Sequence, residues 1–507
     1  MGPIDDTAFQ ARIRPDALAA VDLASGRTWS YRELDAAIDR CTGLLRTGLG
    51  CAVGDRVASL ARNRVELVIL HLACARAGLI YVPLNWRLSA PEVAALIADA
   101  EPQLVVGDAD LAGLATLGLT TDELARRIDV ACERVVEPVD PERVSLILFT
   151  SGTSGQPKGV MLSERAQRQT AINFSLLGRV DGRSRILIDT PMFHIIGLIT
   201  SVRPILMQGG VLLVSDGFDP ARTLARLSEP DLAVTHYFCV PQMADRIRAQ
   251  PAFDGGRLSS LTALFTGGAP HPAAAIQAWL DSGVSVVDGF GMSEAGTVLG
   301  MALDPAIIAA KAGAAGVPAP GIELRLVDGE GQDMSSGQPG ELLLRGPNLF
   351  SGYWRRDDET AKAFTADGWF RTGDIAVADA DGYLTIVDRR KDMYISGGEN
   401  VYPAEIEAAL ADFPGVIEAA VVGVPDARWG EVGVCAIVHP DSEDTLHERV
   451  REHLRPRLAS YKLPRHVVAV QALPRTGSGK VKKGDLRQIA LALLADREAH
   501  SATTSLG

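Results

Sequence analysis

The chain has 507 residues, which is too long for one compact hydrophobic core, so two or more domains are expected. Hydrophobic residues make up 47% and charged residues 22% of the chain, values that are ordinary for a folded protein and argue against extensive disorder. The formal net charge of −13 argues against a nucleic-acid partner, because neutralising phosphates requires clustered Lys and Arg.

The cysteines and the apolar stretches indicate the cellular compartment in which the protein is expected. The six cysteines are scattered, with no Cys-x-x-Cys pair and no Cys/His cluster at zinc spacing, which is typical of a reducing cytoplasm. The first residues carry no basic start of a secretion signal, and Asp6 stands where a myristoylation signal has Ser or Thr. The most apolar stretch, 65–84, is interrupted by charged residues and Pro83, so it predicts a buried helix running into a strand and no integral membrane segment.

Helical and strand patterns alternate along the first 300 residues or so, and then change. The alternation predicts layered α/β subdomains, and the short strands separated by Gly, Pro and Asp turns between 316 and 388 predict a small β-rich subdomain. A charged cluster at 388–392 is the best candidate boundary, dividing an N-terminal domain over 1–390 from a small α+β C-terminal domain over 391–507. Helices are expected at 31–47 and 64–77, and strands at 57–60, 104–106, 186–188, 211–214, 284–287, 323–327 and 341–344.

A loop rich in Ser, Thr and Gly, 150–159, lies between the apolar runs 146–149 and 160–162. Its glycines allow backbone N–H groups to close on an anion, its hydroxyls add donors, and Lys158 adds a charge. A Walker loop has Gly-Lys-Ser/Thr opening a helix, whereas here Pro157 precedes the lysine and a strand follows. The sequence therefore predicts a phosphate-binding loop of another kind. A flexible linker is the other interpretation, but linkers rarely lie between two buried strands.

Further motifs follow this loop in order over nearly the whole chain. The motifs are Pro191-Met192-Phe193-His194, Thr266-Gly267-Gly268-Ala269-Pro270, Gly289-Phe290-Gly291-Met292-Ser293-Glu294, Trp369-Phe370-Arg371-Thr372-Gly373-Asp374, Asp388-Arg389-Arg390-Lys391-Asp392, Ser396-Gly397-Gly398-Glu399-Asn400 and Pro474-Arg475-Thr476-Gly477-Ser478-Gly479-Lys480. Together with the loop they resemble the adenylate-forming superfamily of acyl-CoA synthetases, peptide-synthetase adenylation domains and luciferases.

The resemblance implies a two-step reaction. A carboxylate attacks the α-phosphorus of ATP to give an acyl-adenylate and pyrophosphate, and the thiol of coenzyme A then displaces AMP to give a thioester. Because negative charge builds on the phosphoryl group and the pyrophosphate, cations and N–H donors should supply most of the catalysis. The expected partners are ATP, Mg²⁺, coenzyme A and a small carboxylic acid, and the resemblance also allows a homodimer.

The resemblance assigns roles to residues of these motifs. Taken singly, each has an ordinary interpretation: a neighbour of a helix start for Glu294, a turn residue for Asp374, a solvated lysine for Lys480. Ser293 and Phe290 stand where the family more often has Thr and Tyr, which keeps the hydroxyl and the stacking face. Glu294 is the expected metal ligand. The expected catalytic residues are Lys480, Glu294, Thr150 and His194. The expected ATP- and AMP-binding residues are Thr150, Ser151, Gly152, Thr153, Ser154, Gly155, Lys158, Gly268, Ala269, Pro270, Asp288, Gly289, Phe290, Gly291, Met292, Ser293, Asp374 and Arg389.

A hinge is also implied, at Lys391. Lys480 must be present for adenylation and must then withdraw so that a thiol can reach the acyl carbon, a problem that domain alternation solves. The segment Ser396, Gly397, Gly398 and Glu399 would line the channel for coenzyme A. A simple turn is the other interpretation of its two glycines.

The expected acyl pocket is almost wholly apolar. Amino-acid-activating relatives have Asp after the Phe of their motif, where this chain has His194, and the pocket segments contain no arginine for a second carboxylate, although Arg203 is not far away. Medium- or long-chain fatty acids and aryl acids are therefore expected. His194 could position the carboxylate, guard the thiol passage, or be a core histidine. The pocket residues are His194, Ile195, Ile196, Tyr237, Gly267, Gly268, Gly289, Met292 and Val298; Tyr353 and Trp369 are expected as packing residues.

The function expected first is an AMP-forming acyl-CoA synthetase, an acid–thiol ligase. An adenylating enzyme that loads a separate carrier protein is the second hypothesis. A non-catalytic nucleotide-binding protein on the same fold is the third, and it would be expected to lack Lys480 or Glu294, both of which this chain has. An unrelated P-loop NTPase is the fourth, and the missing Gly-Lys-Ser/Thr argues against it.

Overall fold

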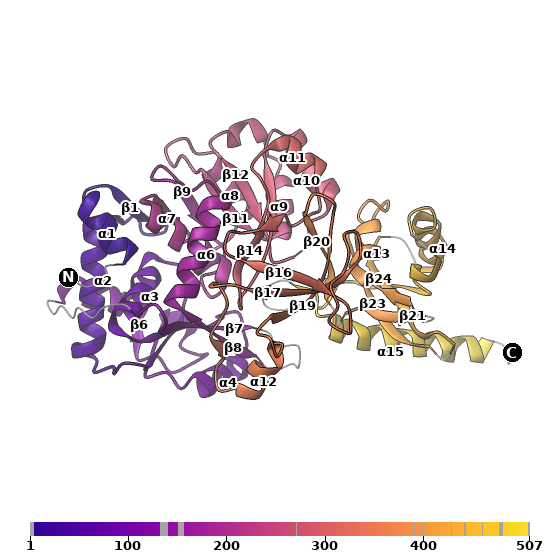
Figure 1. Cartoon of the computed structure of the whole chain (residues 1–507), viewed down its shortest axis with the longest axis horizontal. Helices are drawn as coiled ribbons and strands as arrows, with labels where there is room; N and C mark the ends of the chain where they lie inside the picture. Colours follow the sequence, from indigo (N-terminus) through magenta and orange to yellow (C-terminus); the bar gives the residue numbers. More distant parts are fainter. Residues whose placement is uncertain are drawn as a thin grey trace. The chain divides into compact units, whose positions relative to one another are not determined.

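The computed structural model describes residues 5–131, 140–150, 157–269, 271–389, 392–396, 399–426, 428–440, 443–458, 460–475 and 480–504. The chain divides into two compact units: unit 1 is Met1–Leu324 with Leu344–Phe370, and unit 2 is Arg325–Leu343 with Arg371–Gly507 (Figure 1). The mixed α/β architecture with a large N-terminal part and a small C-terminal part confirms the expected fold class. Residues 390 and 391 lie outside the described residues, and the domain boundary placed between them stays a prediction.

Unit 1 is built on two sheets. Within the described residues, the larger sheet has nine strands in the order β15-β14-β13-β12-β11-β9-β10-β1-β2. Its six central strands, from β13 across to β1, are parallel. Most residues of these strands are buried and apolar, since helices or loops cover both faces of a parallel sheet. The strands are β1 (Leu18–Asp22), β2 (Thr28–Ser30), β9 (Arg185–Ile188), β10 (Val211–Val214), β11 (His236–Cys239), β12 (Ala263–Thr266), β13 (Val286–Met292), β14 (Gly296–Gly300) and β15 (Val317–Pro318).

The second sheet of unit 1 has the order β18-β8-β7-β4-β3-β5-β6 in the described part of the chain. Strands β3 to β7 are parallel, whereas β8 pairs antiparallel with β7 and with β18. The strands are β3 (Arg56–Leu60), β4 (Ile80–Pro83), β5 (Leu104–Gly107), β6 (Leu119–Thr120), β7 (Val144–Thr150), β8 (Lys158–Ser163) and β18 (Gly352–Tyr353).

Helix α6 (Glu164–Leu177) contacts both sheets of unit 1, since it packs on β8 of one and β14 of the other (Figure 1). The helix expected at 31–47 forms as α2 and continues as a π-helical segment, η1 (Leu44–Gly48), which the apolar spacing did not indicate. The remaining helices of unit 1 are α1 (Asp6–Ile13), α2 (Tyr31–Gly43), α3 (Val65–Ala77), α4 (Ala90–Ala100), α5 (Thr121–Val130), α7 (Arg203–Gln208), α8 (Pro220–Leu227), α9 (Pro241–Arg248), α10 (Ala273–Asp281), α11 (Pro305–Ala310) and α12 (Asp357–Ala363).

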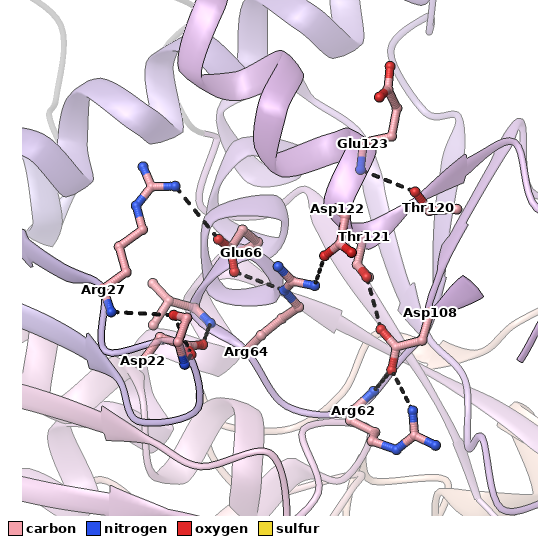
Figure 2. A network of polar contacts seen from close by, with 12 residues as sticks. Asp22, Arg27, Arg62, Arg64, Glu66, Asp108, Thr120, Thr121, Asp122 and Glu123 are labelled. Carbon is pink, nitrogen blue, oxygen red and sulfur yellow. Dashed lines mark hydrogen bonds and ion pairs between the residues drawn. The ribbon is translucent and has the colours of Figure 1, made fainter. Parts of the chain in front are cut away.

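A polar network fixes the loop that follows β3 (Figure 2). Asp108, which follows β5, accepts hydrogen bonds from the Arg62 backbone N–H (2.9 Å) and from Arg62 Nη1 (3.2 Å). Arg64 Nη1 donates a 3.0 Å hydrogen bond to Asp122 Oδ1 at the start of α5. Both chain neighbours of Asn63 are thus tied to other elements of unit 1 by hydrogen bonds.

A four-stranded sheet, β16-β17-β19-β20, provides the β-rich subdomain expected between 316 and 388. In unit 2, β22-β21-β24-β23 form a second sheet, with β25 pairing with β24. Neighbouring residues of β23 face opposite sides: Val421 packs with α13 and α14, and Val422 packs with α15. The elements are β16 (Glu323–Val327), β17 (Gly340–Arg345), β19 (Phe370–Ala378), β20 (Leu384–Arg389), β21 (Tyr394–Ser396), β22 (Glu399–Val401), α13 (Pro403–Ala409), β23 (Glu418–Asp426), β24 (Gly430–Val438), α14 (Glu443–Leu454), β25 (His466–Ala469) and α15 (Lys483–Thr504).

Candidate active site

The expected phosphate-binding loop lies at the end of a β-hairpin. β7 and β8 pair antiparallel up to Thr150 and Lys158, which face each other at the base of the loop. Gly159 packs so closely that a Cβ there would lie 2.9 Å from Ile147 Cγ2, which explains the glycine. The strands predicted on both sides of the loop are confirmed. Residues Ser151, Gly152, Thr153, Ser154 and Gly155 lie outside the described residues, and their roles stay predictions.

Glu294 lies in the turn of the hairpin formed by β13 and β14, and not beside a helix start. The turn is tight: a Cβ on Gly291 would lie 2.4 Å from the Gly296 carbonyl oxygen, and Gly296 itself has a φ of +58°. Glu294 is buried, with 9% exposure. The half-buried residues 289–293, all expected to bind nucleotide, precede it on the same hairpin.

Tyr353, expected as a packing residue, contacts the expected metal ligand. Its Oη donates a 3.0 Å hydrogen bond to Glu294 Oε1. Burial, together with the Glu294 carboxylate, raises the pKa of Tyr353, so the phenol stays protonated and acts as the donor. The ring of Tyr353 lies 4.9 Å from Lys158 Nζ, and Lys158 forms an ion pair with Glu359 of α12. Tyr353 therefore links Lys158 of β8 to the hairpin that carries Glu294.

The glycines of the expected acyl pocket lie beside apolar side chains. A Cβ on Gly268 would lie 3.7 Å from Ile196 Cδ1 and 3.9 Å from Val240 Cγ1. A Cβ on Gly267 would lie 3.3 Å from the Gly289 carbonyl oxygen and 3.3 Å from the Phe238 ring. The structure therefore brings these expected residues together, and it adds Val240 and Phe238, which the motifs did not include.

Tyr237 points away from Phe238, as neighbouring residues of a strand do. The Tyr237 hydroxyl donates a 2.9 Å hydrogen bond to Asp189 Oδ1, and Thr223 Oγ1 donates one of 2.6 Å to Asp189 Oδ2. Burial raises the pKa of Asp189 to about 6. The Tyr237 hydroxyl is engaged in this buried network, and a contact between Tyr237 and an acyl group stays a prediction.

His194 is half-buried at the start of an irregular helical segment. The π-helical turn η3 (Ile196–Thr200) follows it, and a Cβ on Gly197 would lie 2.4 Å from the Pro191 carbonyl oxygen, so only glycine lets η3 pack against this turn. Asn63 binds the same turn from the neighbouring sheet: its Nδ2 donates to the Thr190 carbonyl and its Oδ1 accepts from the Met192 N–H, both at 2.9 Å. Asn63 is buried, and no motif indicates it.

Asp288 lies within β13, at the last residue that pairs with β12, and belongs to a buried polar group. Thr266 Oγ1 donates a 2.9 Å hydrogen bond to Asp288 Oδ1, and His271 Nδ1 lies 3.1 Å from Thr266 Oγ1. Burial raises the pKa of Asp288 to about 7 and lowers the pKa of His271 to about 4. His271 follows the expected Gly-Gly-Ala-Pro segment and was not among the expected residues.

Arg203, considered as a partner for a second substrate carboxylate, is already bound within unit 1. Its Nη2 donates to Glu164 Oε1 (2.7 Å), to Glu164 Oε2 (2.9 Å) and to Gln167 Oε1 (3.1 Å). A buried ion pair of this kind is costly to break, because the partner would be left as an uncompensated buried charge. Arg203 is therefore a structural residue.

In unit 2, Asp374 and Arg389 face each other across β19 and β20. Asp374 is buried and belongs to a strand, which replaces the turn interpretation. Ser396 pairs with Glu399 across β21 and β22, on either side of residues 397 and 398. Arg475 and Val481 form an isolated bridge that closes the base of the loop carrying Lys480, which is exposed. Pro270, Lys391, Gly397 and Gly398, and the side chains of Arg389 and Glu399, lie outside the described residues.

The carboxylate of Glu294 in unit 1 suits a magnesium ion that is bound together with a substrate phosphate. Among the residues that the structure describes, no group of three or more His, Cys, Asp and Glu side chains is arranged to hold a metal ion. Mg²⁺ typically binds through one or two carboxylates, with water and substrate phosphates completing the shell. The single carboxylate of Glu294 suits this mode. Over the described ranges, no helix has the length and apolar character needed to cross a bilayer.

Comparison with known proteins defines the class of enzyme. The AMP-binding enzyme family matches residues 8–354, and the AMP-binding enzyme C-terminal domain matches residues 405–480. A feruloyl-CoA synthase of Amycolatopsis sp. is 38% identical, over 94% of this chain and 97% of the relative. A long-chain-fatty-acid–CoA ligase of Mycobacterium tuberculosis is 35% identical, over 94% and 96%. The ATP-bound MatB of Rhodopseudomonas palustris superposes with a TM-score of 0.87 at 31% identity, covering 96% of this chain and 99% of that chain.

The chain belongs to the AMP-binding enzyme family, which is the adenylate-forming superfamily. Within it, the chain is an AMP-forming acid–thiol ligase of the acyl-CoA synthetase type, which uses ATP, Mg²⁺ and coenzyme A. The family expected from the motifs is thereby confirmed, as are the expected cosubstrates.

Proposed function

We propose that the acid activated by this ligase is apolar, either a medium- or long-chain fatty acid or an aryl acid. The observation that supports this proposal most strongly is the surface around Gly267 and Gly268, where the nearest side chains are Ile196, Phe238 and Val240. Phe238 stacks on Phe174 with ring centroids 5.6 Å apart. An apolar tail gains free energy from leaving water for such a lining, whereas a second carboxylate would pay a desolvation cost without a cationic partner.

The engagement of Arg203 by Glu164 supports the same proposal, because it removes the nearest cation considered for a second carboxylate. Two similar enzymes, the feruloyl-CoA synthase and the long-chain-fatty-acid–CoA ligase, act on an aryl acid and on fatty acids. We extend this substrate range to the present chain. Transfer to a carrier protein in place of coenzyme A is the alternative acceptor.

The residue roles belong to this proposal. Thr150 and Lys158 would hold the β- and γ-phosphates, Glu294 would bind the magnesium ion, and Asp374 with Arg389 would hold the ribose. Lys480 would approach the carboxylate and the α-phosphate, where its charge offsets the repulsion between two anions. His194, in the segment held by Asn63, would lie beside the carboxylate or the thiol passage.

Exchange of labelled pyrophosphate into ATP tests the proposal. Each member of a panel of fatty, aryl, dicarboxylic and amino acids is supplied with Mg²⁺, and coenzyme A is then added to the best acid. We expect exchange only with apolar monocarboxylic acids, AMP as the nucleotide product, and a coenzyme A thioester. Preferred exchange with a dicarboxylic or amino acid would overturn the substrate class. Exchange without any thioester would favour the carrier-protein alternative.

The variant Lys480→Ala provides the residue-level check. We expect it to lose at least about 100-fold in exchange, because it removes a cation from the developing charge. Lys482→Ala, two residues along and near Asp485, is the matched control and should exchange normally.

A further inference from the structure

Lys158 already has an anionic partner in unit 1. Its Nζ forms an ion pair with Glu359 Oε2, and the side chains of Lys158 and Glu359 are 21% and 36% exposed. The same Nζ lies 4.9 Å from the centroid of the Tyr353 ring. The ammonium group therefore lies between a carboxylate and an aromatic face, both of which stabilise its charge.

The position of Glu359 is fixed by the backbone around it. The Tyr353 N–H donates a 2.8 Å hydrogen bond to Thr360 Oγ1, which holds α12 against β18. Gly352 has a φ of +132°, and a Cβ there would lie 3.0 Å from Thr360 Cγ2. Arg355, between β18 and α12, has a φ of +52°, a conformation that costs energy for a residue other than glycine and persists only where its surroundings enforce it. The ion pair between Lys158 and Glu359 is thus part of a turn whose backbone these contacts hold in place.

The same turn is tied to the expected metal ligand. Tyr353 Oη binds Glu294 Oε1, and the Phe350 N–H donates a 2.8 Å hydrogen bond to the Glu294 carbonyl. A triphosphate held by Lys158 and by the magnesium ion on Glu294 would therefore approach this turn, and its oxygens would need the ammonium group that Glu359 holds. The single ammonium group of Lys158 cannot form a full ion pair with both Glu359 and the triphosphate.

We propose that Glu359 is a built-in competitor of the ATP triphosphate for Lys158. The proposal rests on the role given to Lys158 above. ATP binding exchanges one anion for another at the ammonium group, so part of the phosphate contact is offset by the lost ion pair. When pyrophosphate leaves, Lys158 forms its ion pair with Glu359 again, which favours the release of the product.

Calorimetric titration of the full chain with ATP and Mg²⁺, without acid or coenzyme A, tests this proposal. Removing the competing charge with Glu359→Gln should lower the Kd for ATP about two- to fivefold, the range typical of a partly exposed ion pair. Asp358→Asn removes the same charge from the neighbouring, exposed residue of α12 and is the matched control, for which we expect an unchanged Kd. A gain in affinity cannot come from damage to the fold.

Lys158→Ala separates the possible outcomes. We expect it to raise the Kd for ATP, and we expect Glu359→Gln to have no further effect in that background. If Lys158→Ala leaves the Kd unchanged, the role of Lys158 in phosphate binding fails, and the competitor fails with it. If Lys158→Ala weakens binding but Glu359→Gln does not strengthen it, only the competitor is overturned. Equal tightening by Asp358→Asn would also overturn it, because the effect would then come from the general field of α12.

Discussion

Asp288 shows how one buried carboxyl group can make the stability of the enzyme depend on pH. Its ordinary pKa of 3.8 is raised to about 7 by burial, so the folded chain holds a proton that the unfolded chain has already lost. This contribution to stability is complete below pH 3.8 and is lost as the pH rises through 7. From pH 5 to pH 8, the group should therefore lower the free energy of unfolding by about 2–3 kcal/mol.

The variant Asp288→Asn should lack this dependence while keeping an oxygen that can accept from Thr266. We expect the stability of the variant relative to the natural chain to increase steadily from pH 5 to pH 8, as measured by urea unfolding at each pH. Asp231→Asn, at an exposed position, should show no such trend. A constant difference for Asp288→Asn across this range would contradict the raised pKa.

The turn that carries His194 depends on contacts from another sheet. Asn63→Ala would remove both hydrogen bonds to this turn and leave the Thr190 carbonyl and the Met192 N–H without their partner. An unsatisfied buried polar group costs about 1–3 kcal/mol, so the turn should shift. We expect kcat/KM for the acid to fall about tenfold, while the Kd for ATP stays within about twofold.

Steady-state exchange assays and ATP titration measure the two quantities. Asn85→Ala, which removes the acceptor of a local hydrogen bond from the Arg87 N–H, is the control and should leave both unchanged. An equal loss of acid turnover and of ATP affinity in Asn63→Ala would indicate general damage in place of a displaced turn.

Local sequence patterns predict the helices and strands well, but they predict poorly which side chains distant in sequence come into contact. The strands on both sides of the phosphate loop follow from two apolar runs, and the hairpin and the positions of the glycines follow from short-range sterics. Tyr353 and Glu294 are 59 residues apart in sequence, and Asn63 and Met192 are 129 apart, so no local pattern links them. The motifs place Tyr237 in the expected pocket and do not include Phe238, which lies beside Gly267, because a motif does not show which face of a strand each residue occupies.

The residues proposed to bind ATP are divided between the two units. Thr150, Lys158 and Glu294 belong to unit 1, whereas Asp374 and Lys480 belong to unit 2. That the chain has more than one domain follows from its length, whereas the boundary expected between residues 390 and 391 stays a prediction. The alternation of domains stays a prediction, which rests on the family resemblance at Lys391 and on the chemistry, because the same lysine would have to serve one half-reaction and leave room for the other.

Lys391→Pro tests this alternation, because proline fixes φ at the expected hinge. We expect thioester formation from preformed acyl-adenylate to fall more than adenylation does, whereas Lys480→Ala should impair adenylation far more than thioester formation. Single-turnover assays of each half-reaction measure both effects. Lys391→Ala removes the same side chain without restricting the backbone and should affect both steps little. Equal losses in both half-reactions for both variants would contradict domain alternation.

The acyl-adenylate route itself can be followed by isotope. The carboxylate of the best apolar acid is labelled with ¹⁸O, and the enzyme is supplied with unlabelled ATP, Mg²⁺ and coenzyme A. Attack of the carboxylate on the α-phosphorus makes one labelled oxygen the bridge of the acyl-adenylate, and displacement by the thiol leaves that oxygen on AMP. Mass spectrometry should therefore find one ¹⁸O atom in each AMP formed. Unlabelled AMP, or label in pyrophosphate or ADP, would contradict the account.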